Sequence, residues 1–71
     1  MKKKIKAKDR FLALLKVKGF TLIKLSKHQD ITISLQALRM LSSQRMGVTY
    51  QNALIICQVT GYDFDDLFEL R

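Results

Sequence analysis

The chain has 71 residues, of which 48% are hydrophobic, and a formal net charge of +7 at pH 7, which suits one small folded domain and is unlike the composition of a disordered chain. One cysteine and one histidine exclude an internal disulfide and are too few for a zinc site. No apolar run approaches the roughly 20 residues that span a bilayer, and the basic N-terminus lacks the apolar segment of a signal peptide, so we expect a cytoplasmic protein without membrane association.

The charges are unevenly distributed along the chain. Residues 1–18 hold eight basic residues against the single acid Asp9, whereas residues 62–71 hold four acids against the single base Arg71. Such a molecule presents its basic end to polyanions and keeps its acidic end away from them. The distribution therefore favours a nucleic-acid partner.

Apolar residues recur at helical spacing in five short segments. Residues 1–8 contain too little apolar surface to fold alone and are predicted to be a flexible basic arm, so the folded domain covers residues 9–71. The expected helices are residues 8–18, 22–28, 35–43 and 50–60, and a last short helix that begins at Asp63. No segment reads convincingly as a β-strand, so the fold class is predicted to be all-α.

Hydroxyl residues and glycines mark the helix boundaries. Thr21, Ser34 and Thr49 stand where N-caps accept hydrogen bonds from the first helical turn. Gly19 and Gly61 stand where a helix ends in the left-handed conformation. These signals divide the chain into helices separated by short turns.

The apolar faces of these helices define a predicted core. Leu54 belongs to it as part of the broad apolar face of the fourth helix, so an aspartate there is expected to abolish cooperative melting by burying an unpaired charge. The predicted core residues are Phe11, Leu14, Leu15, Leu25, Leu38, Leu41, Leu54, Ile56, Cys57, Phe64, Leu67 and Phe68.

Four short motifs occur in an order typical of one family. They are Gly19-Phe20-Thr21 after the first helix, Leu25-Ser26 in the second, Ile33-Ser34 at the start of the third, and GYDFDDLF at residues 61–68. Through these motifs the chain resembles the phage-repressor type of helix-turn-helix, the family of lambda repressor and Cro. The resemblance implies a compact five-helix, lambda-repressor-like DNA-binding domain in which the second and third helices form a central helix-turn-helix.

The sequence departs from that family at three places. When both Leu25 and Ile33 are aligned with the family, the turn between the second and third helices is two residues longer than the family's, and the extra residues fall within residues 28–32. Leu22 replaces a Gln that is common at the start of the second helix, where the family contacts phosphate. Members of the family often carry an Arg late in the first helix and a Glu late in the third, and this chain has Leu15 and Ser42 there. Because both charges are absent together, neither is left buried without its partner.

The resemblance places the N-terminal part of the third helix in the DNA major groove. There Gln36 would pair with adenine, and Arg39 with a guanine edge or a phosphate. In the alternative interpretation, Gln36 and Arg39 are ordinary solvated residues, and the lysines of the arm only increase solubility. The candidate DNA-binding residues are Ser34, Leu35, Gln36, Ala37, Arg39, Met40 and Ser43 in the third helix, Lys24, Lys27 and Arg45 on either side of it, and Lys2, Lys3 and Lys4 in the arm.

The sequence thus predicts a small transcription regulator of phage or mobile-element type that binds double-stranded operator DNA as a homodimer. A second interpretation is an antirepressor or repressor modulator that binds another repressor protein through Leu35, Met40 and Met46, because apolar side chains suit a protein surface better than a wet groove. His28 has no nucleophile partner in a recognisable motif, and helix capping explains the acids of residues 63–69. No enzyme activity, cofactor, metal site or small-molecule substrate is therefore expected.

Overall fold

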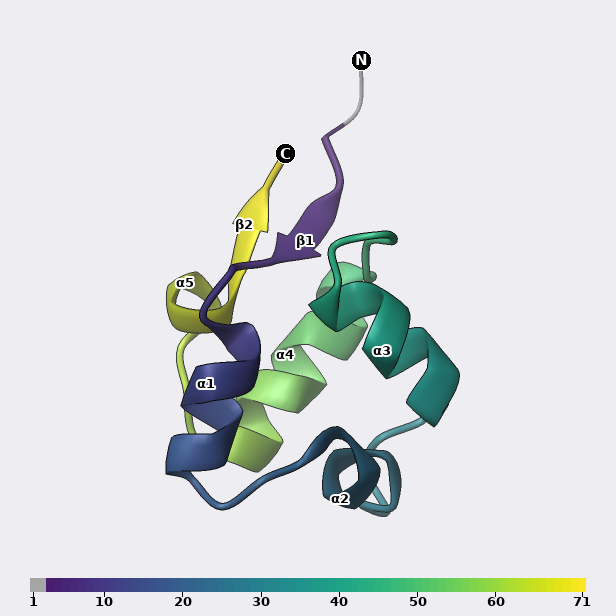
Figure 1. The fold of residues 1–71 in the computed structure, drawn as a ribbon. Helices are drawn as coiled ribbons and strands as arrows, with labels where there is room; N and C mark the ends of the chain where they lie inside the picture. The colour runs from purple at the N-terminus through teal and green to yellow at the C-terminus, as the bar shows by residue number, and fades with distance from the viewer. Residues whose placement is uncertain (1–2) are drawn as a thin grey trace.

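The computed structural model describes residues 3–71. These residues form five helices and a two-stranded antiparallel sheet. In chain order the elements are β1 (Ile5–Ala7), α1 (Phe11–Val17), α2 (Leu22–Ser26), α3 (Leu35–Ser42), α4 (Tyr50–Thr60), α5 (Phe64–Leu67) and β2 (Phe68–Leu70). Figure 1 shows α4 in the middle of the molecule, with α1 and α5 on one side and α2 and α3 on the other. Within the described residues, no helix is long and apolar enough to span a membrane.

β1 and β2 join the two ends of the chain. Ile5 pairs with Leu70 in antiparallel register, and beyond them the backbones of Lys4 and Arg71 exchange hydrogen bonds of 2.7 and 2.9 Å. The expectation of an all-α fold is therefore wrong, because part of the segment expected to be a flexible arm forms β1. Strands of three residues show no alternation in the sequence, and these two are separated by most of the chain, so no local pattern indicates the pairing.

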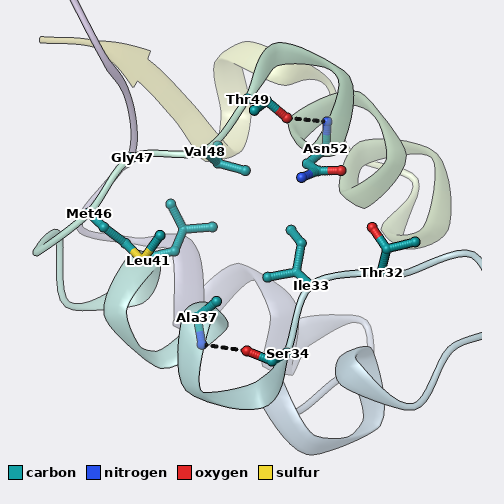
Figure 2. Close-up of a pocket in the computed structure, with 10 residues that line it drawn as sticks. All are labelled: Thr32, Ile33, Ser34, Ala37, Leu41, Met46, Gly47, Val48, Thr49 and Asn52. Atoms are coloured by element: carbon teal, nitrogen blue, oxygen red, sulfur yellow. Dashed lines mark hydrogen bonds between the residues drawn. The ribbon is translucent and has the colours of Figure 1, made fainter.

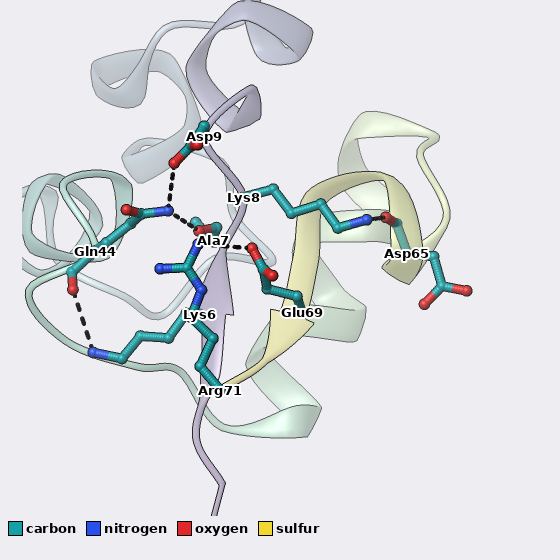
Figure 3. A network of polar contacts seen from close by, with 8 residues as sticks. All are labelled: Lys6, Ala7, Lys8, Asp9, Gln44, Asp65, Glu69 and Arg71. Carbon is teal, nitrogen blue, oxygen red and sulfur yellow. Dashed lines mark hydrogen bonds and ion pairs between the residues drawn. The ribbon is translucent and has the colours of Figure 1, made fainter.

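β1 is also bonded along its other edge, to the loop between α3 and α4. The N–H of Val48 donates to the carbonyl oxygen of Ile5 at 2.9 Å. Nε2 of Gln44 donates to the carbonyl oxygen of Ala7 and to Oδ1 of Asp9, both at 2.9 Å (Figure 3). β1 thus lies between β2, its partner in the sheet, and the α3–α4 loop, to which an isolated bridge joins it.

The predicted N-caps of α2, α3 and α4 are confirmed. The hydroxyl oxygens of Thr21, Ser34 and Thr49 accept hydrogen bonds from the backbone N–H three residues later, at 3.1, 3.1 and 3.2 Å. The predicted glycine ends are confirmed as well, since Gly19 and Gly61 follow α1 and α4 with φ of 80° and 82°. Each of these signals acts within one helical turn, which is why the sequence alone reveals them.

α3 ends in the same left-handed manner, but without a glycine. Gln44 has a φ of 65°. Its N–H donates to the carbonyl oxygen of Leu41 at 3.0 Å, and the N–H of Arg45 donates to that of Met40 at 2.9 Å, which is the Schellman pattern of a helix end. A residue with a Cβ loses about 1–2 kcal/mol in this conformation. The bonds from its side-chain amide to β1 and Asp9 offset that loss.

Most of the predicted core is confirmed. Phe11, Leu15, Leu25, Leu38, Leu41, Ile56, Cys57, Leu67 and Phe68 are buried as predicted. Ala7 and Ile31 are buried without having been predicted, and Ala53, which belongs to the predicted apolar face of the fourth helix but not to the predicted core, is buried as well. Leu14 and Phe64 are partly buried and pack against this core.

The placement of Leu54 in the core is wrong, because 37% of its surface is exposed. α4 buries Ala53, Ile56, Cys57 and Thr60, whose i, i+3, i+4 and i+7 spacing defines one helical face. Leu54 follows Ala53 by about 100° around the helix axis, which places it beside that face.

Two substitutions on α4 test this orientation. Leu54→Asp is expected to lower the free energy of unfolding by about 1 kcal/mol or less, because the new carboxylate stays hydrated. Ile56→Asp should abolish cooperative melting, because Ile56 is fully buried and the charge would have no partner. Thermal melting followed by circular dichroism compares the two. A Leu54→Asp protein without a cooperative transition would show that the inward face of α4 is misassigned.

A second pair of substitutions tests the role of Gln44. Gln44→Ala is expected to destabilise the fold by about 1–3 kcal/mol, because the carbonyl of the buried Ala7 loses the amide that donates to it. Gln44→Gly loses the same bonds but relieves the left-handed strain, so it should be about 1 kcal/mol more stable than Gln44→Ala. Urea denaturation measures both. Equal stability of Gln44→Ala and the wild type would contradict this role.

Candidate nucleic-acid interface

α3 buries one side and exposes the other. Leu38 and Leu41 are 0% and 2% exposed, and the helix packs against α2 and β1. On its outer side, five residues line one shallow surface hollow, which we call the α3 face: Gln36, Arg39, Met40, Ser43 and Arg45.

A second surface hollow lies next to the α3 face. Lys3 and Lys4 line it together with Arg45 and Tyr50, and we call these four residues the N-terminal hollow. Because Arg45 lines both hollows, the basic residues ahead of β1 and the outer side of α3 form one continuous surface. Sequence reasoning missed Tyr50, because only the pairing of β1 with Val48 brings the start of α4 beside the two lysines.

The cations of this surface form no salt bridge within the described part of the chain. Within residues 3–71, Arg71 is the only lysine or arginine that forms a salt bridge, with Glu69 at 3.0 Å. The acids of α5 lie on the other side of α4 from α3 (Figure 1). Since Lys3, Lys4, Arg39 and Arg45 take no part in the ion pairs of residues 3–71, the α3 face and the N-terminal hollow can attract polyanions.

Not every lysine of the basic segment contributes to this surface. Nζ of Lys6 donates to a backbone carbonyl oxygen of the α3–α4 loop at 3.3 Å, and Nζ of Lys8 donates to one in α5 (Figure 3). Both side chains therefore donate hydrogen bonds to the backbone of the domain. Lys3 and Lys4 reach the N-terminal hollow, and Lys2 lies outside the described residues.

Three of the predicted contacts in the third helix lie away from the α3 face. Ser34 is the N-cap, and its Oγ accepts from the N–H of Ala37 at 3.1 Å. Ala37 itself lines a cavity on the side of α4 (Figure 2), and Leu35 is half-buried. The other four predicted contacts of this helix lie together on the α3 face.

The two predicted lysines of the second helix are not brought together with these residues. Lys24 and Lys27 are exposed, and Nζ of Lys24 lies 3.5 Å from the carbonyl oxygen of Gly19. Neither lines the α3 face or the N-terminal hollow. They precede the start of α3 along the chain, whereas Arg45 follows its end.

The connection between α2 and α3 is long. Residues 27–34 separate the two helices, whereas a helix-turn-helix uses a turn of about 3–4 residues. Ile31 anchors the connection in the core with 7% of its surface exposed, and Nδ1 of His28 accepts a hydrogen bond from the N–H of Asp30 at 3.1 Å. The connection is therefore packed against the domain, and α3 keeps its contact with α2.

The arrangement suits non-covalent binding of anions. Burial of Cys57, followed by the charges of Asp63 and Asp66, raises the pKa of its thiol, which keeps the thiol protonated and poorly nucleophilic. Within residues 3–71, no three His, Cys, Asp or Glu side chains gather to hold a metal ion. What the surface offers instead is cationic charge beside the hydrogen-bonding side chains of Gln36 and Arg39.

No protein-family model matches the chain, and no match is found among curated proteins or among solved structures. Its function must therefore be inferred from its own residues. Three features carry that inference: the α3 face, the N-terminal hollow and the cations that form no salt bridge within the described chain.

Proposed function

We propose that the chain is a small transcription regulator of phage or mobile-element type that binds operator DNA through α3, the second helix of the predicted helix-turn-helix. The observation that carries the proposal is the continuous surface of the α3 face and the N-terminal hollow, where hydrogen-bonding side chains lie beside cations that form no salt bridge among the described residues. The similarity of the motifs at residues 19–21, 25–26, 33–34 and 61–68 to those of phage repressors supports the same assignment.

The dimensions of α3 suit a DNA groove. α3 has eight residues, and an α-helix with its side chains is about 10–12 Å in diameter, which the major groove of B-DNA, about 12 Å wide, admits. Gln36 carries an amide that can bond N6 and N7 of adenine, and Arg39 a guanidinium that can bond N7 and O6 of guanine. Arg45, Lys3 and Lys4 contact phosphates, which contribute affinity without reading sequence.

A homodimer on a palindromic operator follows from the same resemblance. Two copies of α3 would then enter half-sites about 34–36 Å apart, which is one turn of B-DNA. Each phosphate contact releases counterions, so the logarithm of the affinity should fall with the logarithm of the salt concentration by about 0.9 per contact. Binding of this kind takes place in the cytoplasm, where we expect the protein to act.

A randomised-duplex selection with the purified protein tests DNA binding and finds the site together. On the selected duplex, Gln36→Ala and Arg39→Ala are each expected to weaken binding by about 1–3 kcal/mol and to relax the preference at one base position. Lys3→Ala and Lys4→Ala should weaken binding to all sequences alike and lower the salt slope by about 1 each, because they remove phosphate contacts.

Lys16→Ala is the matched control for these substitutions. Lys16 is exposed on α1 and lines neither the α3 face nor the N-terminal hollow. The Lys16→Ala protein should bind the selected duplex with the same affinity and the same salt slope as the wild type. Salt-insensitive binding, or an equal loss in Lys16→Ala and Arg39→Ala, would contradict the proposal.

Two observations favour a second candidate function, an antirepressor or repressor modulator that binds another repressor protein. Met40 and Met46 are 37% and 39% exposed, and methionine is common on surfaces that adapt to protein partners. The connection formed by residues 27–34 is also longer than the turn of a DNA-reading helix-turn-helix. In this candidate a repressor protein, and not DNA, covers the α3 face.

Met40→Asp tests the second candidate. It should abolish co-purification with the product of the neighbouring gene, because it buries an unpaired charge in an apolar contact, while Gln36→Ala should leave the complex intact. Leu35→Asp is a poorer probe, because Leu35 is half-buried and the change would also disturb the fold. A protein that recovers no partner and shifts a defined duplex at physiological salt would exclude this candidate.

A further inference from the structure

A half-open cavity of about 260 Å³ lies between α3 and α4. Figure 2 shows side chains converging on it from both helices and from the segments that precede them. Its apolar wall consists of Ile33, Ala37, Leu41, Met46 and Val48. α3 packs against α2 and β1, and the cavity lies on the side of α3 that faces α4, as its lining by Ala37 and Asn52 shows.

Asn52 faces the apolar wall from α4. Its backbone N–H donates to Oγ1 of Thr49 at 3.2 Å, whereas its side-chain amide has no hydrogen-bond partner within residues 3–71. The side chain is half-buried, and in Figure 2 its amide points across the gap toward Thr32 and Ile33. Because the side chain is half-buried, water solvates the carboxamide, and a ligand that displaces this water can bond its donor and its acceptor.

No acidic or basic side chain lines the cavity. A ligand charge placed there would lose its hydration and meet no counter-charge, which is strongly unfavourable. The volume equals that of about nine water molecules at about 30 Å³ each, so the cavity suits a ligand of roughly eight to ten non-hydrogen atoms. The lining thus selects for small size, an apolar body and a neutral polar group.

We propose that this cavity binds a small uncharged amphipathic molecule. Its apolar body lies against Ile33, Leu41 and Val48, and its hydrogen-bonding group meets the carboxamide of Asn52. This combination of an apolar enclosure with one orienting polar group is typical of small-molecule sites in proteins.

Occupancy of the cavity couples α3 to α4. Ala37 and Leu41 belong to α3, whereas Asn52 belongs to α4, so a bound molecule contacts both helices and sets the distance between them. Because α3 carries the α3 face, the ligand also sets the position of Gln36 and Arg39. This regulatory consequence rests on the proposed function, whereas the ligand site itself does not.

Isocaproamide, with a branched apolar body and one neutral amide, is a suitable probe. Titrated into isotope-labelled wild-type protein, it is expected to cause saturable NMR shift changes at Ala37, Leu41, Val48 and Asn52, with a dissociation constant in the millimolar range or below. Acetamide lacks the apolar body, and isocaproate carries a charge in place of the amide. Both are expected to bind about tenfold more weakly or not at all.

Substitutions then locate the site. Ala37→Phe fills the cavity and should abolish the response, whereas Gln51→Phe, at an exposed position of α4 outside the cavity, should leave it unchanged. Asn52→Leu keeps nearly the same shape and removes the hydrogen-bonding amide, so it should weaken isocaproamide binding by about fivefold. Melting curves establish that each variant is folded, and Asn52→Leu carries the test if Ala37→Phe is not.

Three results would overturn the ligand site: no saturable response in the wild type, a response that survives Ala37→Phe, or equal binding of isocaproamide and isocaproate. The coupling is measured separately, as a change in duplex affinity on adding isocaproamide that is present in the wild type and absent in Ala37→Phe. An unchanged duplex affinity at saturating probe overturns the coupling alone. A protein that binds isocaproamide but no duplex overturns the proposed function and leaves the ligand site standing.

Discussion

Hydrogen bonding along both edges of β1 holds the two ends of the chain and the α3–α4 loop together. β2 occupies one edge, and the backbone of Val48 and the side chain of Gln44 occupy the other. A strand of three residues makes few bonds, so its stability depends on packing, and Ala7 supplies this by being fully buried in the core. The loop reaches β1 because it has glycine at the closest approach: a Cβ on Gly47 would stand 2.9 Å from the carbonyl oxygen of Ile5.

The same bonds determine where the candidate interface lies. The left-handed turn at Gln44 ends α3 and places Arg45 between the α3 face and the N-terminal hollow. An eight-residue helix is marginal by itself, so α3 depends on the burial of Leu38 and Leu41 and on its contacts with α2 and β1. A cavity lies on the side of α3 that faces α4. A molecule bound in the cavity would contact α3 and α4 together, which is the physical basis for linking the cavity to the interface.

Local signals in the sequence were sufficient for the five helices that the structure describes. The caps at Thr21, Ser34 and Thr49 and the glycine ends depend on residues within one turn, so no knowledge of the tertiary structure was needed to find them. The uneven distribution of charge is likewise a property of the chain itself. The sequence did not show that Lys6 and Lys8 are bonded within the fold, because their partners are carbonyl oxygens of distant segments.

The sequence by itself therefore determined the helices, most of the core and the polarity of charge. Only the tertiary structure decided the sheet, the inward face of α4 and the composition of the interface. Leu54 and Ala53 both belong to one apolar stretch, and only the packing of α4 against its neighbours decides which of them is buried. Arg45 and Lys4 become neighbours through the pairing of β1 with the α3–α4 loop. Such contacts join segments far apart in the chain, and they depend on the register and orientation of whole elements, which no local pattern specifies.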